Sequence, residues 1–243
     1  MRALILSDIH SNLEALTAVV DDAVSRGGFD VLWCLGDVVG YGPDPGPCIE
    51  LIRRYDLLAV AGNHDYGAVG KRGVDDFNDA AKAANHWTSS QLSAEETEFI
   101  RGLPEIVTVE PFTMVHGSLR DPVDEYVLER EAALATLKLL PTSFCLVGHS
   151  HYPFICRENA GSPLFFQFAE DEAFPLGDER LIINPGGVGQ PRDRDPRPSY
   201  AIYDSLAKNI RRHRVTYGIQ VTQEKMRTAG LPESLIERLS HGI

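Results

Sequence analysis

The segment Leu146-Val-Gly-His-Ser-His-Tyr152 places two histidines, His149 and His151, directly after a short apolar run. The run at 144–147 has the length and composition of a buried strand, so both histidines follow the carboxyl end of that strand. In an extended backbone, residues two positions apart point to the same side. We therefore expect both imidazoles to reach into one pocket as metal ligands or catalytic groups, although surface loop histidines would also fit this segment alone.

The first sixty residues predict a β-α-β-α-β unit. Apolar runs indicate strands at 3–6, 31–35 and 57–61, and helical spacing is present at 13–24 and 49–55. Such alternation favours a mostly parallel sheet with right-handed crossovers. In an open α/β sheet, ligands bind at the carboxyl ends of the strands, so the residues that follow these runs are candidates for a binding site.

Residues with oxygen or imidazole donors follow five of the expected strands. They are Asp8 and His10, Asp37, Asn63, His64 and Asp65, His116, and His149 and His151. Each group alone has an ordinary explanation as a turn, a helix cap or a surface residue. Their agreement carries the argument, because all of them fall at the same end of expected strands. No cysteine belongs to the set, which favours ions such as Mn, Fe, Zn or Ni over a thiolate zinc site.

The remainder of the chain predicts further strands and a helical tail. Residues 75–101 are helical in character, and 130–140 forms another helix. Strands are expected at 106–109, 112–115, 144–147, 154–156, 164–168, 181–183, 200–203 and 210–215. Together these strands predict a second, mixed sheet packed on the first. We expect one domain, 1–243, in which residues 218–243 are a C-terminal tail of short helices.

Composition narrows the partners and the location of the protein. The chain has 243 residues, 43% of them hydrophobic, and a formal net charge of −12. An acidic surface repels nucleic-acid backbones, so no stable nucleic-acid complex is expected. The four cysteines form no C-x-x-C pair and are expected to be free thiols in a reducing cytoplasm. No apolar run is long enough for a signal peptide or a membrane span, so we expect a cytoplasmic protein without membrane association.

The motifs, taken in order along the chain, resemble those of one large enzyme family. They are D-x-H at 8–10, G-D-x-x-G at 36–40, G-N-H-D at 62–65, H-G at 116–117 and G-H-S-H at 148–151. The sequence resembles the calcineurin-like metallophosphoesterase superfamily, in particular its small bacterial and archaeal phosphodiesterases. This resemblance implies an α/β fold, a four-layer α/β/β/α sandwich of two mixed β-sheets flanked by helices.

The resemblance also implies a dinuclear site. One metal ion would be held by Asp8, His10, Asp37 and His151, and the other by Asp37, Asn63, His116 and His149. The ions would be divalent transition metals, with Mn favoured and Fe, Ni, Co or Zn as alternatives. The implied reaction is attack of a metal-bridged hydroxide on a small phosphate ester, with a phosphodiester favoured.

Other residues near the motifs receive weaker expectations. His64 follows the ligand Asn63 and would contact the phosphoryl oxygen or protonate the leaving oxygen as a general acid. Asp65 is expected to be a turn residue or to orient a neighbour. Substrate contacts are expected from Arg192, Tyr41 and Asn12. For Arg192 a solvated charge run is the alternative, and for Asn12 helix capping is favoured.

A phosphodiesterase with a small substrate is the favoured function, and three alternative functions are weighed against it. Protein Ser/Thr phosphatases of the superfamily carry Asp and Arg where this chain has Gly40 and Tyr41, and Glu where it has Asp65, which argues against that class. A symmetrical dinucleoside polyphosphate hydrolase is neither excluded nor specifically supported. A non-catalytic scaffold of the same fold is disfavoured because His64 and every ligand position are filled. The expected partner is a small phosphorylated substrate, and a homo-oligomer is left open.

Overall fold

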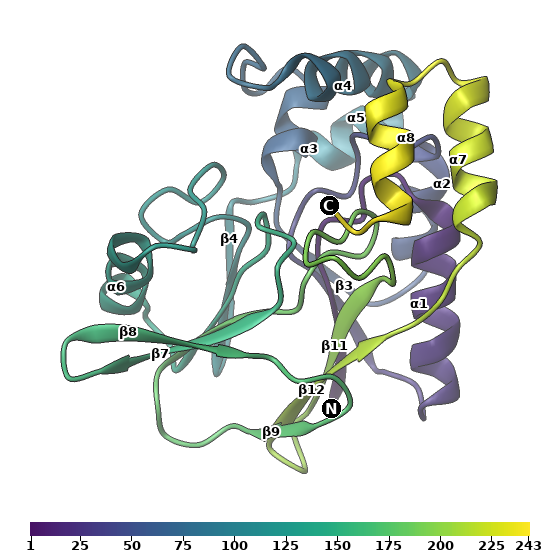
Figure 1. The fold of residues 1–243 in the computed structure, drawn as a ribbon. Helices are drawn as coiled ribbons and strands as arrows, with labels where there is room; N and C mark the ends of the chain where they lie inside the picture. Colours follow the sequence, from purple (N-terminus) through teal and green to yellow (C-terminus); the bar gives the residue numbers. More distant parts are fainter.

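The computed structural model describes residues 1–243 and contains two mixed sheets of six strands each, with helices around them (Figure 1). In the first sheet the spatial order is β3 (Leu57–Ala59), β2 (Val31–Cys34), β1 (Arg2–Leu6), β11 (Ser199–Asp204), β12 (Asn209–Arg214) and β9 (Ala173–Pro175). In the second it is β4 (Ile106–Val109), β5 (Phe112–Val115), β6 (Phe144–Leu146), β10 (Leu181–Asn184), β7 (Phe154–Asn159) and β8 (Ser162–Gln167). The α/β class with two mixed sheets flanked by helices is confirmed.

The helices divide between the two sheets. Those that follow strands β1, β2 and β3 in the chain are α1 (Leu13–Ser25), α2 (Pro45–Ile52), α3 (Asn63–Ala68), α4 (Asp79–Gln91) and α5 (Ala94–Arg101). The second sheet is covered by α6 (Arg130–Leu139), which shares an apolar cluster with β6, β7 and β10. The chain ends in α7 (Ile219–Thr228), α8 (Glu233–Glu237) and the 3₁₀ turn η1 (Arg238–Ser240).

Strand β1 is buried on both faces, as its uninterrupted apolar run predicts. Leu4 and Leu6 pack in the cluster that includes α1, whereas Ala3 and Ile5 pack in the cluster between the two sheets. This second cluster centres on aromatic rings, with Trp33 from the first sheet 5.3 Å from the ring of Phe112 in the second. The interlocked rings hold the two sheets in one relative position, and both sheets deliver their carboxyl ends to the same region.

The division of strands between the sheets differs from the expectation. The segments 200–203 and 210–215 do not extend the second sheet, because β11 pairs antiparallel with β1 and β12 pairs with β11. The physical reason is that β1 needs a partner on each side, and Tyr200 and Ile202 complete the apolar cluster beneath α1. The short strand β9, which pairs with β12, was not expected.

The structure gives the helical segments exact limits. Residues 75–101 are helical, as expected, and form two helices, because Ser93 caps α5 and accepts a hydrogen bond from the Glu96 N–H. The helix expected at 49–55 begins earlier, at Pro45, whose fixed φ suits the first helical turn. The motif at 62–65 is the start of α3 rather than a simple turn, since Asn63 is its first residue.

The C-terminal tail forms short helices, as expected, and packs beside α4 and α1 (Figure 1). Met226, Leu235 and Leu239 bury their side chains in one apolar cluster with Tyr41 and residues of α4. The chain end is also tied down, because the Arg194 N–H donates to the main-chain oxygen of Gly242 at 2.8 Å. Through the contact with Tyr41, the tail therefore packs against the loop that follows β2.

Two further expectations are checked by the fold. All four cysteines are buried and none forms a disulfide. No helix combines the length and the apolar composition needed to cross a bilayer.

Replacing Trp33 with alanine should destabilise the protein strongly. The indole is 1% exposed and joins the two sheets, so its loss leaves a large cavity between them. We expect the free energy of unfolding to fall by about 3–5 kcal/mol in urea titrations. Leu206→Ala is the matched control, because Leu206 is 91% exposed. A loss from Trp33→Ala no greater than that of the control would contradict a joining role for the indole.

Candidate metal centre

The loops that follow the strands of both sheets are joined by main-chain hydrogen bonds. The Asp8 N–H donates to the Gly36 oxygen at 3.0 Å, and the His10 N–H donates to the Asp37 oxygen at 2.9 Å. The Gly148 N–H donates to the His116 oxygen at 2.9 Å, which links two loops of the second sheet. The side chains that follow separate strands are therefore held in one place by backbone bonds as well as by packing.

The backbone turns sharply at most of the candidate ligands. Asp8, His10, Asp37, His149 and His151 all have φ between 48° and 63°, in the left-handed region. Non-glycine residues rarely adopt this conformation, and each costs of order 1–3 kcal/mol that the surrounding structure must offset. Strain of this kind concentrated at one site is typical of a functional centre.

The sharp turns change how the two histidines of 148–151 are arranged. The expectation that His149 and His151 point the same way from an extended backbone is wrong, because both residues are left-handed. The His151 ring stacks on His10 with centroids 4.9 Å apart, whereas the His149 ring lies 4.9 Å from that of His116. The two imidazoles therefore enter two different groups of side chains.

The first group could hold a cation and consists of Asp8, His10, Asp37 and His151, all buried. One donor atom from each lies within 4.8 Å of all the others. His151 Nε2 is 3.2 Å from Asp8 Oδ1, and His10 Nε2 is 3.5 Å from Asp37 Oδ2. The Nε2 atoms of His10 and His151 also face each other at 3.1 Å. Two nitrogen lone pairs at this distance repel each other unless a proton or a cation binds to one of them.

The second group consists of Asp37, His116 and His149, again with donor atoms within 4.8 Å of one another. His116 Nε2 lies 3.4 Å from Asp37 Oδ2. Asp37 thus belongs to both groups. The histidine-to-group assignments agree with those that the family resemblance implies, and coordination itself remains a prediction.

Main-chain carbonyls fix the orientation of the histidines. His10, His116 and His151 each place Nδ1 against a carbonyl oxygen, at 3.2, 2.7 and 2.5 Å. Since a carbonyl only accepts, Nδ1 carries a hydrogen in each of the three, and Nε2 is the nitrogen that faces the centre. His149 is reversed, because its Nε2 donates to the Asp124 oxygen at 3.0 Å and Nδ1 is left free.

The residues present fit divalent cations. Four buried polar atoms of the candidate residues have no hydrogen-bond partner: Asp8 Oδ1, Asn63 Oδ1, His64 Nδ1 and His116 Nε2. A buried polar atom without a partner costs roughly 1–3 kcal/mol, so several at one place are unfavourable unless a ligand satisfies them. Carboxylate, amide and imidazole donors together suit a divalent transition metal.

The ionisation of the site shows how strongly it favours positive charge. Burial opposes the charge of Asp8 and Asp37, yet neighbouring histidines hold the pKa of both carboxyl groups below the usual range. Burial likewise opposes protonation of His116, but the Asp37 carboxylate raises its pKa to about 9. The buried carboxylates therefore recruit a proton onto a histidine, as they would recruit a cation.

His64 occupies the edge of the centre rather than either group. Its ring lies 4.3 Å from that of Tyr41 and 4.5 Å from that of Phe77. Burial lowers its pKa to about 4, against the attraction of Asp37. The main chain is fixed as well, because the His64 N–H donates to Asp37 Oδ1 at 2.9 Å.

Asp65 connects two of the motifs. Its carboxylate accepts from the Val39 N–H and from the Gly62 N–H, both at 3.0 Å. Gly62 itself approaches Asp37 so closely that a Cβ there would lie 2.0 Å from Asp37 Oδ1. Asp65 and Gly62 therefore set the position of Asp37 without belonging to the candidate ligands.

A cavity of about 210 Å³ opens onto the centre. Asn63, His64 and His149 lie on its inner side, and Tyr41, Phe77 and Tyr126 add aromatic surface. The Tyr126 ring stacks on His149 with centroids 3.8 Å apart. Sequence reasoning missed Phe77 and Tyr126, because neither belongs to a motif and each reaches the cavity from a long loop.

The weaker candidates differ in their surroundings. Tyr41 lines the cavity as expected, edge-on to His10 at 4.6 Å. Asn12 caps α1, its Oδ1 accepting from the Ala15 N–H at 3.1 Å, and its Nδ2 donates to the Gly189 oxygen at 2.9 Å. Arg192 lies beside Tyr41, with Cζ 6.0 Å from the ring centroid. Substrate contacts from these residues stay predictions.

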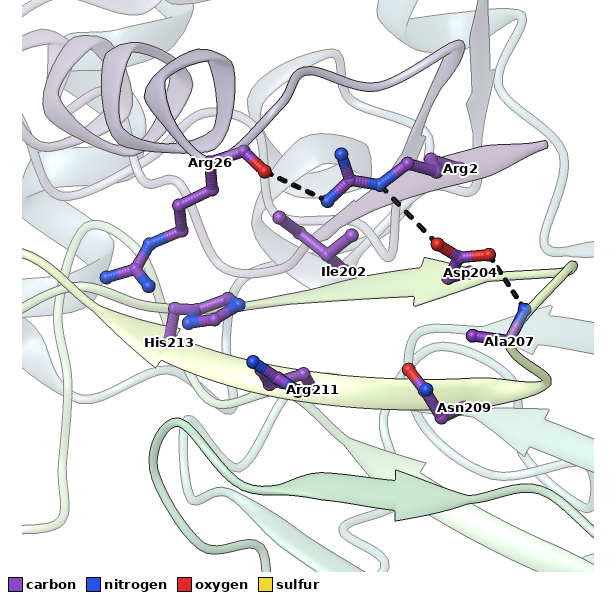
Figure 2. A pocket seen from close by; sticks show the side chains of 8 residues that line it. All are labelled: Arg2, Arg26, Ile202, Asp204, Ala207, Asn209, Arg211 and His213. Carbon is purple, nitrogen blue, oxygen red and sulfur yellow. Dashed lines mark hydrogen bonds and ion pairs between the residues drawn. The ribbon is translucent and has the colours of Figure 1, made fainter.

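A separate cavity of about 460 Å³ is lined by residues of β11 and β12 and by Arg2 and Arg26 (Figure 2). Arg2, which lines it, donates to the Arg26 main-chain oxygen at 3.2 Å and lies 3.9 Å from Asp204 (Figure 2). Arg211 also lines this cavity and forms no ion pair with an acidic side chain. No candidate ligand lines this cavity.

Comparison with known proteins agrees with the geometry. A family model described as the calcineurin-like phosphoesterase superfamily domain matches residues 1–208. An uncharacterised protein of Methanocaldococcus jannaschii is 39% identical over 242 residues, which cover 98% of this chain and 97% of that protein.

Solved structures share the fold along the whole chain. The crystal structure of a metallophosphoesterase from Sphaerobacter thermophilus is 44% identical, with a TM-score of 0.90, and the match covers 100% of this chain and 99% of that one. A hypothetical protein from Pyrococcus horikoshii is 21% identical, with a TM-score of 0.81 and coverage of 100% and 98%. The second of these relationships is evidence for the fold alone.

Asp37→Asn should reduce bound divalent metal more than Asp8→Asn. Asp37 belongs to both groups of donor atoms, whereas Asp8 belongs to one. The measurement is elemental analysis of each variant after metal loading and desalting, with Asp204→Asn as a control at the separate cavity. Circular dichroism should confirm that all three variants are folded. Equal metal content in Asp37→Asn and Asp8→Asn would remove the case for a shared carboxylate.

Proposed function

The chain belongs to the calcineurin-like phosphoesterase superfamily, and from this premise we propose that it hydrolyses a small phosphodiester with two divalent transition-metal ions, manganese favoured. The observation that carries the proposal is the carboxylate of Asp37, which two separate groups of imidazole and carboxylate donors share. A shared carboxylate between two donor groups is the arrangement expected where two cations lie about 3.5–4 Å apart.

The charge balance supports a phosphate substrate. Asp8 and Asp37 are the carboxylates among the candidate ligands, so two divalent ions would leave the centre with a net positive charge. The protein as a whole carries −12, and an anionic substrate would be attracted to this place rather than to the general surface. When bound, such ions supply positive charge for the phosphoryl oxygens and lower the pKa of a water nucleophile.

The chain's own residues would orient the ester. His64 is fixed by its N–H bond to Asp37 and by the bond from Asn85 Nδ2 to its main-chain oxygen at 2.9 Å. With a pKa of about 4, its imidazole is neutral near pH 7 and can donate one hydrogen bond. It would act on a phosphoryl oxygen directly, or as a general acid once the charge of a bound phosphate raises its pKa.

The size of the cavity favours a small organic ester over a protein substrate. At about 210 Å³ it accepts part of a small molecule, and the rings of Tyr41, Phe77 and Tyr126 offer apolar contact to the esterified group. Protein phosphatases of the superfamily use an Asp and an Arg where this chain has Gly40 and Tyr41. A Cβ at position 40 would lie 2.8 Å from His64 Nδ1, so a side chain there would displace the imidazole.

Chelation should abolish phosphodiester hydrolysis, and Mn²⁺ should restore it better than Mg²⁺. Imidazole-rich donor sets suit transition metals, whereas Mg²⁺ prefers oxygen ligands and water. The assay is bis(4-nitrophenyl) phosphate hydrolysis by metal-stripped protein with Mn, Ni, Co, Zn or Mg added back. Full activity with Mg²⁺ alone, with no transition metal detected by elemental analysis, would contradict the proposed ligands.

His64→Ala should keep its metal and lose activity in a way that reveals the role of the imidazole. A general acid matters most for poor leaving groups, so the loss should be roughly 10²–10⁴-fold for alkyl esters and smaller for nitrophenyl esters. The measurement is kcat/KM over diesters of graded leaving-group pKa, in wild type and variant. Parallel dependence in both proteins would assign His64 to the phosphoryl oxygens instead. Loss of metal would exclude both roles.

A further inference from the structure

The cavity beside the metal centre has two sides of different character. On the inner side lie Asn63, His64 and His149, which are at most 7% exposed. On the outer side lie Asp76 and Asp124, whose side chains are 64% and 39% exposed. No lysine or arginine lines the cavity. With cations bound at the metal centre, the cavity would therefore be positive on its inner side and negative on its outer side.

Arg72 neutralises the outer side only in part. One of its nitrogens lies 2.8 Å from Asp76 Oδ2 and 2.8 Å from Asp124 Oδ1, so a single guanidinium is shared by two carboxylates. Neither carboxylate forms an ion pair with any other cation of the chain. Arg72 itself does not line the cavity, whereas both carboxylates do. The outer side therefore keeps an excess of negative charge, and this excess faces the cavity.

Aromatic rings connect the two sides. The Phe77 ring lies 4.5 Å from that of His64, and the Tyr126 ring stacks on His149 with centroids 3.8 Å apart. Tyr126 is nevertheless 45% exposed, so much of its surface is open. The guanidinium carbon of Arg72 lies 5.1 Å from the centre of the Phe77 ring, which is close enough for an aromatic face to attract a cation. Aromatic faces beside carboxylates are surroundings that favour the binding of ammonium groups.

We propose that the organic group of the substrate carries a positively charged ammonium group, which binds among Phe77, Tyr126 and the two carboxylates of the outer side. The proposal rests on the proposed function, because the phosphate at the metal centre is the group that is hydrolysed. Such an ester is anionic at its phosphate and cationic at its organic group, so its charges match the two sides of the cavity. The cation also offsets the repulsion that the carboxylates exert on an approaching phosphate.

The same distribution of charge disfavours substrates with several phosphates. A second phosphate on the outer side would lie near Asp76 and Asp124, and no lysine or arginine of the cavity lining would receive it. Like charges brought together in a partly buried site repel each other strongly. A dinucleoside polyphosphate therefore fits this cavity less well than a phosphodiester with an ammonium group.

The test compares two ligands that differ in one atom and its charge. The first, 2-(trimethylammonio)ethylphosphonate, has a quaternary nitrogen where the second, 3,3-dimethylbutylphosphonate, has carbon. Neither has a phosphate ester bond that could be hydrolysed. Calorimetry on manganese-loaded protein measures Kd for both. We expect wild type to bind the ammonium ligand roughly 5- to 30-fold more tightly, because the cation is placed among aromatic rings and carboxylates.

Substitution of the carboxylates should change this ratio in a graded way. Asp76→Asn and Asp124→Asn should each lower it several-fold, because Arg72 then neutralises the one carboxylate that remains. The double variant should bring the ratio to one or below, since Arg72 would leave a positive charge on the outer side. Tyr126→Leu should lower the ratio as well, because it removes an aromatic face.

The control is Asp204→Asn, which removes a carboxylate from the separate cavity of Figure 2 and should keep the wild-type ratio. A wild-type ratio near one, or aspartate variants that retain the full ratio, would overturn the proposal. An equal change in the affinity for both ligands would also overturn it, because the carboxylates would then act on the shared phosphonate. Hydrolysis of bis(4-nitrophenyl) phosphate by wild type and Asp204→Asn checks the proposed function separately, so either idea can fail without the other.

Discussion

Two buried carboxylates, Asp8 and Asp37, lie within 4.8 Å of each other where the strands of both sheets end. Like charges at that distance away from water are strongly unfavourable unless positive charge compensates them. Much of the surrounding structure serves this need. Main-chain carbonyls turn the Nε2 atoms of His10, His116 and His151 toward the carboxylates, and the Asp37 carboxylate raises the pKa of His116 to about 9 against the effect of burial.

The same constraint explains the shape of the backbone. Five candidate ligands adopt left-handed φ values, which unconstrained loops would avoid. Main-chain bonds between the loops, and the carboxylate of Asp65 on two N–H groups, hold them there. The aromatic packing of Trp33 between the sheets keeps the strand ends in register. The packed core thus stabilises the strained backbone conformation of the candidate ligands at the carboxyl ends of the strands.

Short sequence patterns were sufficient to predict the strands and the candidate ligands, because both depend on residues close together in the chain. Asp8 and His10, or His149 and His151, stand directly after apolar runs, and the order of the motifs is specific. The sheet to which β11 belongs was missed, because its pairing with β1 depends on residues about two hundred positions apart. Phe77 and Tyr126 were missed for the same reason, since tertiary packing alone brings them to the cavity.

The pairing of β1 with β11 also determines when the fold can be completed during synthesis. Arg2 is in register with Asp204, so one edge of the first strand has no partner until most of the chain has left the ribosome. Until then β1 presents an apolar, unpaired edge, the kind of surface on which nascent chains associate wrongly. Contacts of such long sequence separation also slow folding. The Asp8 loop, which follows this strand, also depends on residues late in the chain, because the Asp8 main-chain oxygen accepts from the Gly189 N–H at 2.8 Å.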